Sequence, residues 1–228
     1  FHAEAGGDAL RMHAVVEGSR SPSPSFYEVR FGEKQVLFQR NSVLLVPDFV
    51  SADECETLIA AANRRAVRGR RHQDGLLRMP ARELDLEAQM LSNALFRDRV
   101  LSFIEQELPA VALELFGRST ELRKMHCTFS TGEPAVNRYE EGGAFTRHTD
   151  KAAFTVNVLL SEPGAFSGGG TLFWPMDEGS TEDALLLQPQ RGTAVFFNGQ
   201  VEHAGRPVTA GVRHLYVGSF DLWSLDES

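Results

Sequence analysis

The sequence predicts an α+β domain in which helices support an antiparallel β-sandwich or barrel. Residues 51–117 carry apolar side chains at helical spacing, whereas from residue 122 onward the spacing is that of short strands. Helices followed by a run of strands are typical of the α+β class. The length of 228 residues suits one large domain, and no internal repeat or change of composition divides it.

The N-terminal part contains no strong helix signal. Residues 1–25 are predicted to form a flexible arm because Gly, Ser and Pro are frequent there, with an edge strand near Leu10–Val16 as the alternative. Residues 26–46 are rich in aromatic and β-branched side chains, which predicts strands. The first residue is Phe1 rather than Met, which suggests a processed or trimmed start and leaves the compartment open.

A first helix is expected from about Ala52 to Asn63. Ser51 is a good N-cap, and Glu54, three residues later, completes a capping-box pattern. A second, mostly helical region covers residues 85–117.

Within this second region, Pro109 should interrupt the helix because proline lacks the N–H group and crowds the preceding turn. Gly117 is a suitable C-terminal stop. The predicted core residues of this region are Met90, Leu91, Leu95, Val100 and Phe103.

Residues 64–82 carry seven arginines within nineteen positions. Such runs of charge are usually solvated, so we expect an exposed loop. A mobile lid or substrate loop is the functional alternative, because an acidic substrate or partner would meet the basic segment of an otherwise acidic chain.

The C-terminal half is predicted to contain eight short strands separated by turn-forming residues. They cover residues 124–130, 135–140, 144–150, 153–160, 170–174, 184–189, 192–198 and 213–223.

Composition excludes several classes of protein. The 23 Lys and Arg residues against 31 Asp and Glu give a net charge of -8, which argues against a general nucleic-acid binder. Only two cysteines, Cys55 and Cys127, are present, too few for a disulfide-rich scaffold or a four-cysteine zinc site. No apolar run reaches the roughly 18 residues of a membrane span. The sequence leaves the oligomeric state open.

A metal site is indicated by His148 and Asp150, which stand two apart in a strand-like segment. Side chains at positions i and i+2 of a strand share one face, so both can reach one ion. His203 follows the strand at residues 192–198. Two histidines and one carboxylate form the facial triad of Fe(II) oxygenases, which leaves open positions on the metal.

Arg213 lies ten residues after His203, within a further predicted strand. An arginine inside a β-barrel is costly unless it meets an anion, and its guanidinium suits a carboxylate. Together with an open Fe(II) site, it suggests a dicarboxylic cosubstrate that chelates iron with one end and pairs with Arg213 at the other.

The chain resembles the Fe(II)/2-oxoglutarate-dependent dioxygenases, in particular the prolyl and lysyl hydroxylase branch. The segments that carry the resemblance are NRYEEGGAFTRHTDKAAFTVNVLL, FSGGGTLFW, LQPQRGTAVFFNG and VEHAGRPVTAGVRHLYVGSFD, with a weaker match in LLVPDFVSADECETLI. The resemblance implies a double-stranded β-helix (jelly-roll, cupin-like) core over residues 122–221. N-terminal helices at 51–117 would buttress it within a single domain at 26–228.

The resemblance also implies residue roles. His148, Asp150 and His203 would ligate Fe(II), and Arg213 would bind the distal carboxylate of 2-oxoglutarate. O2 would be the second cosubstrate and ascorbate the reductant. The residues expected to line the cosubstrate pocket are Tyr139, Thr155, Asn157 and Leu159; in the lysyl hydroxylase branch the matching asparagine contacts 2-oxoglutarate. Collagen-type prolyl 4-hydroxylases usually carry Lys where Arg213 stands here.

The expected reaction is hydroxylation of an unactivated C–H bond, with release of succinate and CO2. The preferred substrate is a prolyl or lysyl side chain of a peptide or protein. A small-molecule hydroxylase or oxidative cyclase is the first alternative, and a catalytically silent β-helix binding module is the second.

Three further motifs have structural interpretations. Gly168–Gly170 form a turn into the next strand, because no P-loop lysine follows. His214 should face away from the site, since it alternates with Arg213. For Arg147, beside His148, surface charge is the favoured role.

Overall fold

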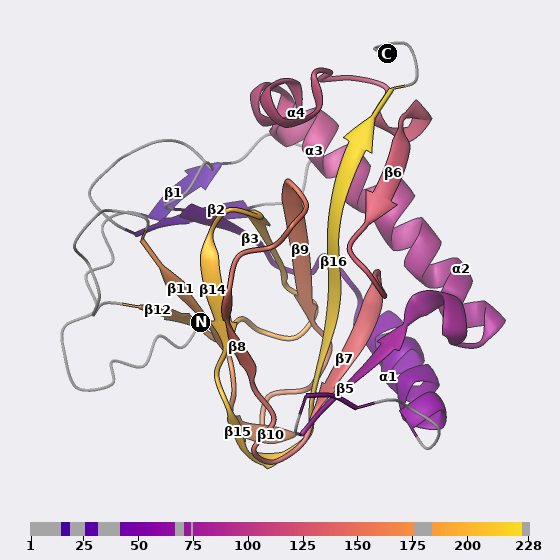
Figure 1. The fold of residues 1–228 in the computed structure, drawn as a ribbon, viewed down its shortest axis with the longest axis vertical. Coiled ribbons are helices and arrows are strands. Elements are labelled where there is room, and N and C mark those ends of the chain that lie inside the picture. Colours follow the sequence, from indigo (N-terminus) through magenta and orange to yellow (C-terminus); the bar gives the residue numbers. More distant parts are fainter. Residues whose placement is uncertain are drawn as a thin grey trace.

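The computed structural model describes residues 15–18, 26–31, 42–66, 71–73, 75–175 and 184–224. The helices pack on one face of a large twisted sheet, and smaller sheets cover the opposite face (Figure 1). The two facing sheets form the predicted double-stranded β-helix, with the helices as its support. Within the predicted N-terminal arm, only Val15–Gly18 is described, and it forms an edge strand.

The large sheet contains ten strands, and each pair of neighbours is antiparallel. In spatial order the strands are β1 (Val15–Gly18), β2 (Phe26–Arg30), β3 (Ser42–Val46), β13 (Ala194–Asn198), β9 (Phe154–Leu159), β16 (Arg213–Trp223), β7 (Ala135–Tyr139), β5 (Leu76–Pro80) and β4 (Arg71–Gln73). The tenth strand, β6 (His126–Phe129), pairs with the C-terminal part of β16.

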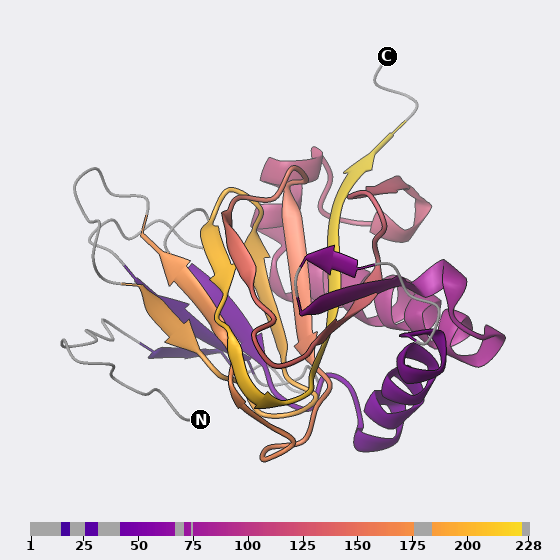
Figure 2. The same ribbon diagram turned by 60° about the horizontal axis from the view of Figure 1, so that its bottom comes forward.

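The facing layer consists of two smaller sheets (Figure 2). The four-stranded sheet has the order β12 (Leu185–Leu187), β11 (Thr171–Trp174), β14 (Glu202–Gly205) and β8 (Phe145–His148). The two-stranded sheet pairs β10 (Phe166–Gly168) with β15 (Val208–Gly211). All eight predicted strands are present. The prediction missed β10, β14 and β15, which are only three or four residues long.

The first helix, α1 (Ala52–Ala66), begins at the predicted capping box. The Ser51 hydroxyl accepts a hydrogen bond from the Glu54 amide at 3.3 Å, and the Glu54 carboxylate accepts one from the Ser51 amide at 2.9 Å. The other helical segments are η1 (Ala81–Glu83), α2 (Leu86–Ala94), the π-helical η2 (Leu95–Val100), α3 (Leu101–Glu107), α4 (Pro109–Phe116) and η3 (Leu122–Lys124). Within the described parts of the chain, no helix has both the length and the apolar character needed to cross a membrane.

The predicted break and stop of the second helical region are confirmed. Pro109 is the first residue of α4, and Leu108 before it leaves the helical conformation. Gly117 ends α4 with a φ of 71°, and its amide donates to the Leu113 carbonyl at 3.0 Å. A left-handed residue at this position suits glycine.

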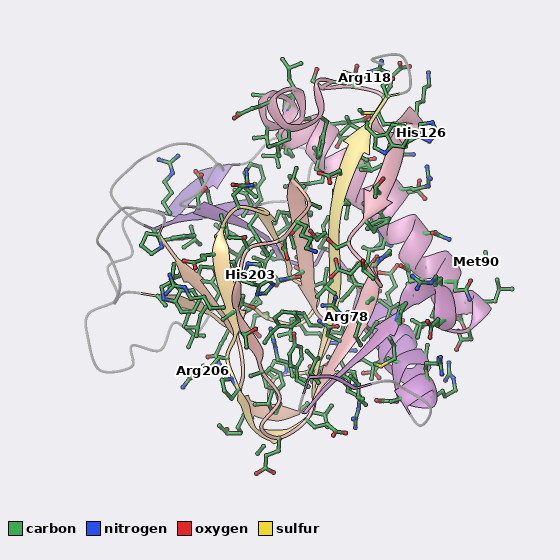
Figure 3. All side chains as sticks on the ribbon, viewed as in Figure 1. Arg78, Met90, Arg118, His126, His203 and Arg206 are labelled. Carbon is green, nitrogen blue, oxygen red and sulfur yellow. The ribbon has the colours of Figure 1, made fainter. Side chains whose placement is uncertain are left out.

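The main apolar core lies between the helices and the large sheet. Leu95, Val100 and Phe103 are buried in it, as predicted. Met90 is not: its side chain is 64% exposed on the outer face of α2 (Figure 3). The reason is geometric, because Ala88 and Ser92 face the sheet and Met90 is about 200° around the helix from each.

The prediction of a loop over residues 64–82 is wrong in part. Helix α1 continues to Ala66, and Leu76–Pro80 form strand β5, which pairs with β7. Leu76 and Met79 are fully buried. Their burial holds β5 in the sheet, although arginines are frequent in this part of the sequence. Positions 67–70 and 74 lie outside the described residues.

Candidate metal centre

A cavity lies between the large sheet and the four-stranded sheet. Strands β5, β7, β9 and β16 line it on one side, and β8, β11 and β14 on the other. His203 projects into the middle of the space between the sheets (Figure 3). The lining residues that matter below are Arg78, Glu133, Asn137, Tyr139, Phe145, His148, Asp150, Thr155, Asn157, His203 and Arg213.

Strand pairing brings the three predicted metal ligands together. His148 ends β8 and lies directly opposite His203 of β14. Asp150 follows two residues later, and its amide donates to the Gly199 carbonyl at 2.8 Å. A Cβ atom at Gly199 would lie 1.9 Å from the Ala152 carbonyl oxygen, so only glycine allows this close approach.

The ligand atoms of the triad converge on one point. The Nε2 atoms of His148 and His203 lie 3.5 and 3.8 Å from the carboxylate oxygens of Asp150. All three ligand atoms are within 4.8 Å of one another, which fits three donors around one ion. Their role as ligands remains a prediction.

Backbone carbonyls fix the orientation of both imidazoles. The Nδ1 atom of His148 lies 2.7 Å from the Thr146 carbonyl oxygen, and that of His203 lies 2.9 Å from the Val201 oxygen. A neutral imidazole that donates from Nδ1 carries its lone pair on Nε2, which is the usual arrangement of a metal-bound histidine. The two Nε2 lone pairs therefore face Asp150.

The charges of the triad favour the binding of a cation between its three side chains. Burial works against a charge on Asp150, but the two nearby histidines and Thr155 outweigh it and hold the pKa of the carboxylate below its usual value. Burial opposes protonation of His148 too, yet the Asp150 and Thr146 oxygens raise its pKa. Burial lowers the pKa of His203. One carboxylate with two imidazoles is a donor set suited to a divalent transition metal.

Arg213 is the most unusual charged group of the cavity. Its side chain is 2% exposed, and its Nε atom has no hydrogen-bond partner. Its Cζ atom lies 5.3 Å from the centre of the Tyr139 ring, and burial lowers its pKa. Among the described residues, no carboxylate pairs with it, so the cavity presents an unmatched cation that an anionic ligand would satisfy.

Residues 134–220 match the family model described as the 2OG-Fe(II) oxygenase superfamily. The matched segment contains the whole triad and Arg213. This segment belongs to the 2OG-Fe(II) oxygenases. Fe(II) and 2-oxoglutarate are accordingly the metal and cosubstrate of this oxygenase segment, and the donor triad with the unpaired Arg213 fits both.

A known protein is similar to this chain over more residues than the family model covers. A PKHD-type hydroxylase from Delftia acidovorans is 27% identical over 125 residues, which are 48% of this chain. The match covers 52% of that relative, so the chain spans about half its length.

Solved structures show that the fold is shared. A prolyl-4-hydroxylase from Pseudomonas putida superposes with a TM-score of 0.56 and 19% identity, covering 78% of this chain and 91% of that one. A prolyl hydroxylase from Trichoplax adhaerens, in complex with a hypoxia inducible factor oxygen degradation domain peptide fragment, gives a TM-score of 0.54 and 12% identity. It covers 78% of this chain and 83% of that chain.

The other predicted pocket residues lie on two strands of the large sheet. Tyr139, Thr155 and Asn157 line the cavity. The Thr155 hydroxyl donates to Asp150 at 2.5 Å and so helps to orient the carboxylate. Leu159 is buried in the apolar cluster beside Tyr139, and its predicted contact with the cosubstrate remains a prediction.

A second polar group of the cavity was not predicted from the sequence. Arg78 of β5 pairs with Glu133 at 3.0 Å and donates from Nε to Asn137 at 3.0 Å. Its Cζ atom lies 5.7 Å from the centre of the Phe145 ring. Asn137 could have been found, because it stands two residues before Tyr139 and shares its strand face. Arg78 could not, because residues 64–82 were interpreted as a loop.

Two of the remaining interpretations agree with the structure. His214 faces the helices, where its Nε2 atom lies 3.0 Å from the Asn63 amide oxygen. Arg147 forms an exposed ion pair with Glu202, and its Cζ atom lies 4.4 Å from the Trp174 ring centre.

Proposed function

We propose that this protein is an Fe(II)- and 2-oxoglutarate-dependent dioxygenase that hydroxylates an unactivated C–H bond and releases succinate and CO2. The observation that carries the proposal is the shared cavity of the triad and the buried, unpaired Arg213. A metal-binding triad alone would fit many metalloproteins. An unmatched cation in the same cavity adds the requirement for an anionic ligand beside the metal.

Each residue of the cavity has a task in this proposal. The Nε2 atoms of His148 and His203 and the carboxylate of Asp150 would hold Fe(II), and Arg213 would bind the distal carboxylate of 2-oxoglutarate. Bound Fe(II), together with 2-oxoglutarate and O2, would supply the oxidising power for C–H hydroxylation. Thr155 would hold the Asp150 carboxylate in place through its hydrogen bond.

The buried surroundings of the triad support this chemistry. The His203 ring packs against the rings of Phe197 and Phe173, at centroid distances of 4.8 and 6.1 Å. These rings exclude water from one side of the metal site, which strengthens electrostatic interactions within it.

We further propose that residues 26–228 act as one catalytic domain. The large sheet and the helices share one apolar cluster, which includes Leu58 of α1, Phe103 of α3 and Phe196 of β13. The helices would therefore fix the sheet from which β16 presents Arg213.

The proposed substrate is a prolyl or lysyl side chain of a peptide or protein. Its support is the fold shared with prolyl hydroxylases, one of which is in complex with a peptide fragment. Asn157 at the cavity wall supports the lysyl hydroxylase branch within this class.

A small-molecule substrate is the second candidate, and one observation favours it. The Arg78–Glu133 ion pair lines the cavity near the triad, with side chains only 14% and 9% exposed. Convergent charged groups in a cavity between two sheets are typical of a pocket for a small polar ligand.

The test is succinate formation from 2-oxoglutarate with Fe(II), ascorbate and O2. Proline-rich peptides, lysine-containing peptides and free amino acids would be compared as substrates, with His148→Ala as the inactive control. Substrate-stimulated succinate release that is absent from the control is the expected result. If the wild-type protein binds neither Fe(II) nor 2-oxoglutarate, the proposal is refuted and the protein is interpreted as a catalytically silent β-helix binding module.

A further inference from the structure

The turn between β10 and β11 consists of three glycines that all have positive φ angles. The values are 71° for Gly168, 63° for Gly169 and 98° for Gly170. Hydrogen bonds hold this turn on both sides. The Gln188 side-chain amide donates to the Gly168 and Gly169 carbonyls at 3.0 and 3.4 Å, and the Gly169 amide donates to the Pro207 carbonyl at 2.8 Å. The turn therefore has a defined position rather than the freedom that three glycines suggest.

Gly169 lies directly against the side chain of Arg213. A Cβ atom at Gly169 would be 3.1 Å from Cδ of Arg213 and 3.1 Å from the ring of Phe166. Both distances are shorter than an ordinary van der Waals contact, so one neighbour would have to move. Gly164, five residues earlier, also has a positive φ angle of 89° but would meet no atom within 4 Å.

Contacts with Tyr139 and Gly169 flank the Arg213 side chain. Within the described part of the chain, its guanidinium has no ion pair, and its Nε atom has no hydrogen bond. The Tyr139 ring lies against the guanidinium, and Gly169 lies beside Cδ of the side chain. A shift of either wall would change where the guanidinium faces the cavity.

We propose that Gly169 is a positioning residue, whose bare backbone sets the direction of the Arg213 side chain towards the anionic end of the cosubstrate. This inference rests on the proposed function, in which that anion is the distal carboxylate of 2-oxoglutarate. It assigns a binding role to the three-glycine turn, which the sequence alone presents only as an entry into β11.

The experiment compares Gly169→Ala with the matched control Gly164→Ala. Both variants place alanine at a positive φ angle, but only the first adds an atom beside Arg213. The full-length protein, loaded with Mn(II) to prevent turnover, is titrated calorimetrically with 2-oxoglutarate and, separately, with oxalate. Oxalate chelates the metal but lacks the distal carboxylate, so it does not depend on Arg213.

Gly169→Ala should weaken 2-oxoglutarate binding at least tenfold and change oxalate binding less than twofold. Gly164→Ala should leave both affinities within twofold of the wild type. The inference is overturned if Gly169→Ala binds 2-oxoglutarate like the wild type, because Phe166 has then yielded instead of Arg213. Equal loss of both ligands also overturns it, because general damage to the cavity then explains the effect.

A second variant covers the case in which Gly169→Ala does not fold. Gln188→Met removes two hydrogen bonds to the turn without adding an atom beside Arg213. It should weaken 2-oxoglutarate binding about threefold or more with oxalate unchanged, and an unchanged 2-oxoglutarate affinity would overturn the inference. A wild-type protein that does not bind 2-oxoglutarate refutes the proposed function itself, whereas wild-type binding matched by all variants refutes only the role of Gly169.

Discussion

Replacing Arg213 with methionine should stabilise the fold and strongly weaken cosubstrate binding. The side chain is 2% exposed and its Nε atom has no partner, so the folded protein carries an unpaired buried charge. An apolar side chain of similar length removes the desolvation cost, which is several kcal/mol for such a charge. The lost interaction with the Tyr139 ring offsets about 1 kcal/mol. We expect a net gain of about 2 kcal/mol, or a rise of about 6 °C in Tm.

The same substitution should weaken 2-oxoglutarate binding about a thousandfold. A guanidinium forms two parallel hydrogen bonds with a carboxylate, and each charge-assisted bond contributes about 2 kcal/mol. Their sum of about 4 kcal/mol corresponds to a factor of about 1,000 in Kd.

Thermal unfolding with and without ligand measures both effects in one series. Mn(II) with 2-oxoglutarate should raise the Tm of the wild type and leave that of Arg213→Met at its Mn(II)-only value. Arg147→Met is the matched control, because Arg147 forms an exposed ion pair with Glu202 and should change stability by less than about 0.5 kcal/mol. A lower Tm for Arg213→Met without ligand would refute the reasoning, since it would mean that the guanidinium is satisfied in the absence of an anion.

Three further predictions concern stability, each measured by urea unfolding. Burial, with a smaller contribution from Arg138, lowers the pKa of His214 to about 4; the unfolded chain therefore takes up this proton first as the pH falls. Stability should drop by about 2 kcal/mol more in the wild type than in His214→Gln between pH 7.5 and 4.5, and parallel profiles would contradict this. Arg78→Met should cost about 3 kcal/mol because it leaves the Glu133 charge buried, and adding Glu133→Gln should restore more than half. Ser51→Ala should cost about 1 kcal/mol through the lost cap, whereas Ser51→Asp should retain most of it.

Two of the three residues of the candidate metal centre could be predicted from a short-range rule. The two-residue spacing of His148 and Asp150 places both on one side of the chain, and this requires no knowledge of the rest of the fold. The position of His203 depends on the pairing of β14 with β8. That pairing was implied only by the family resemblance, since Glu202–Gly205 is too short to be recognised as a strand by its composition.

The parts that were missed depend on long-range contacts. Arg78 enters the cavity because β5 pairs with β7, about sixty residues away in sequence, and no local pattern encodes this pairing. Met90 was assigned to the core because it lies in an apolar stretch, but the packing of α2 on the sheet selects Ala88 and Ser92 instead. The Ser92 hydroxyl meets that of Tyr216 in β16 at 3.0 Å, and this hydrogen bond ties the buried face of α2 to the sheet.

One cavity of the described structure contains a buried arginine and, beside it, a turn of three glycines. Elsewhere in the described chain, buried charged or ionisable side chains keep partners, such as Glu28 with Arg30 and His214 with Asn63. Among the residues that the structure describes, Arg213 has no ionic partner, and the turn beside it holds three consecutive glycines at positive φ angles. A buried arginine without an ionic partner does not stabilise the fold, and it gains a purpose when an anion lies beside the metal. The cost of an unpaired Arg213 is therefore an argument for 2-oxoglutarate that is independent of the triad, because a structural metal site would not require it.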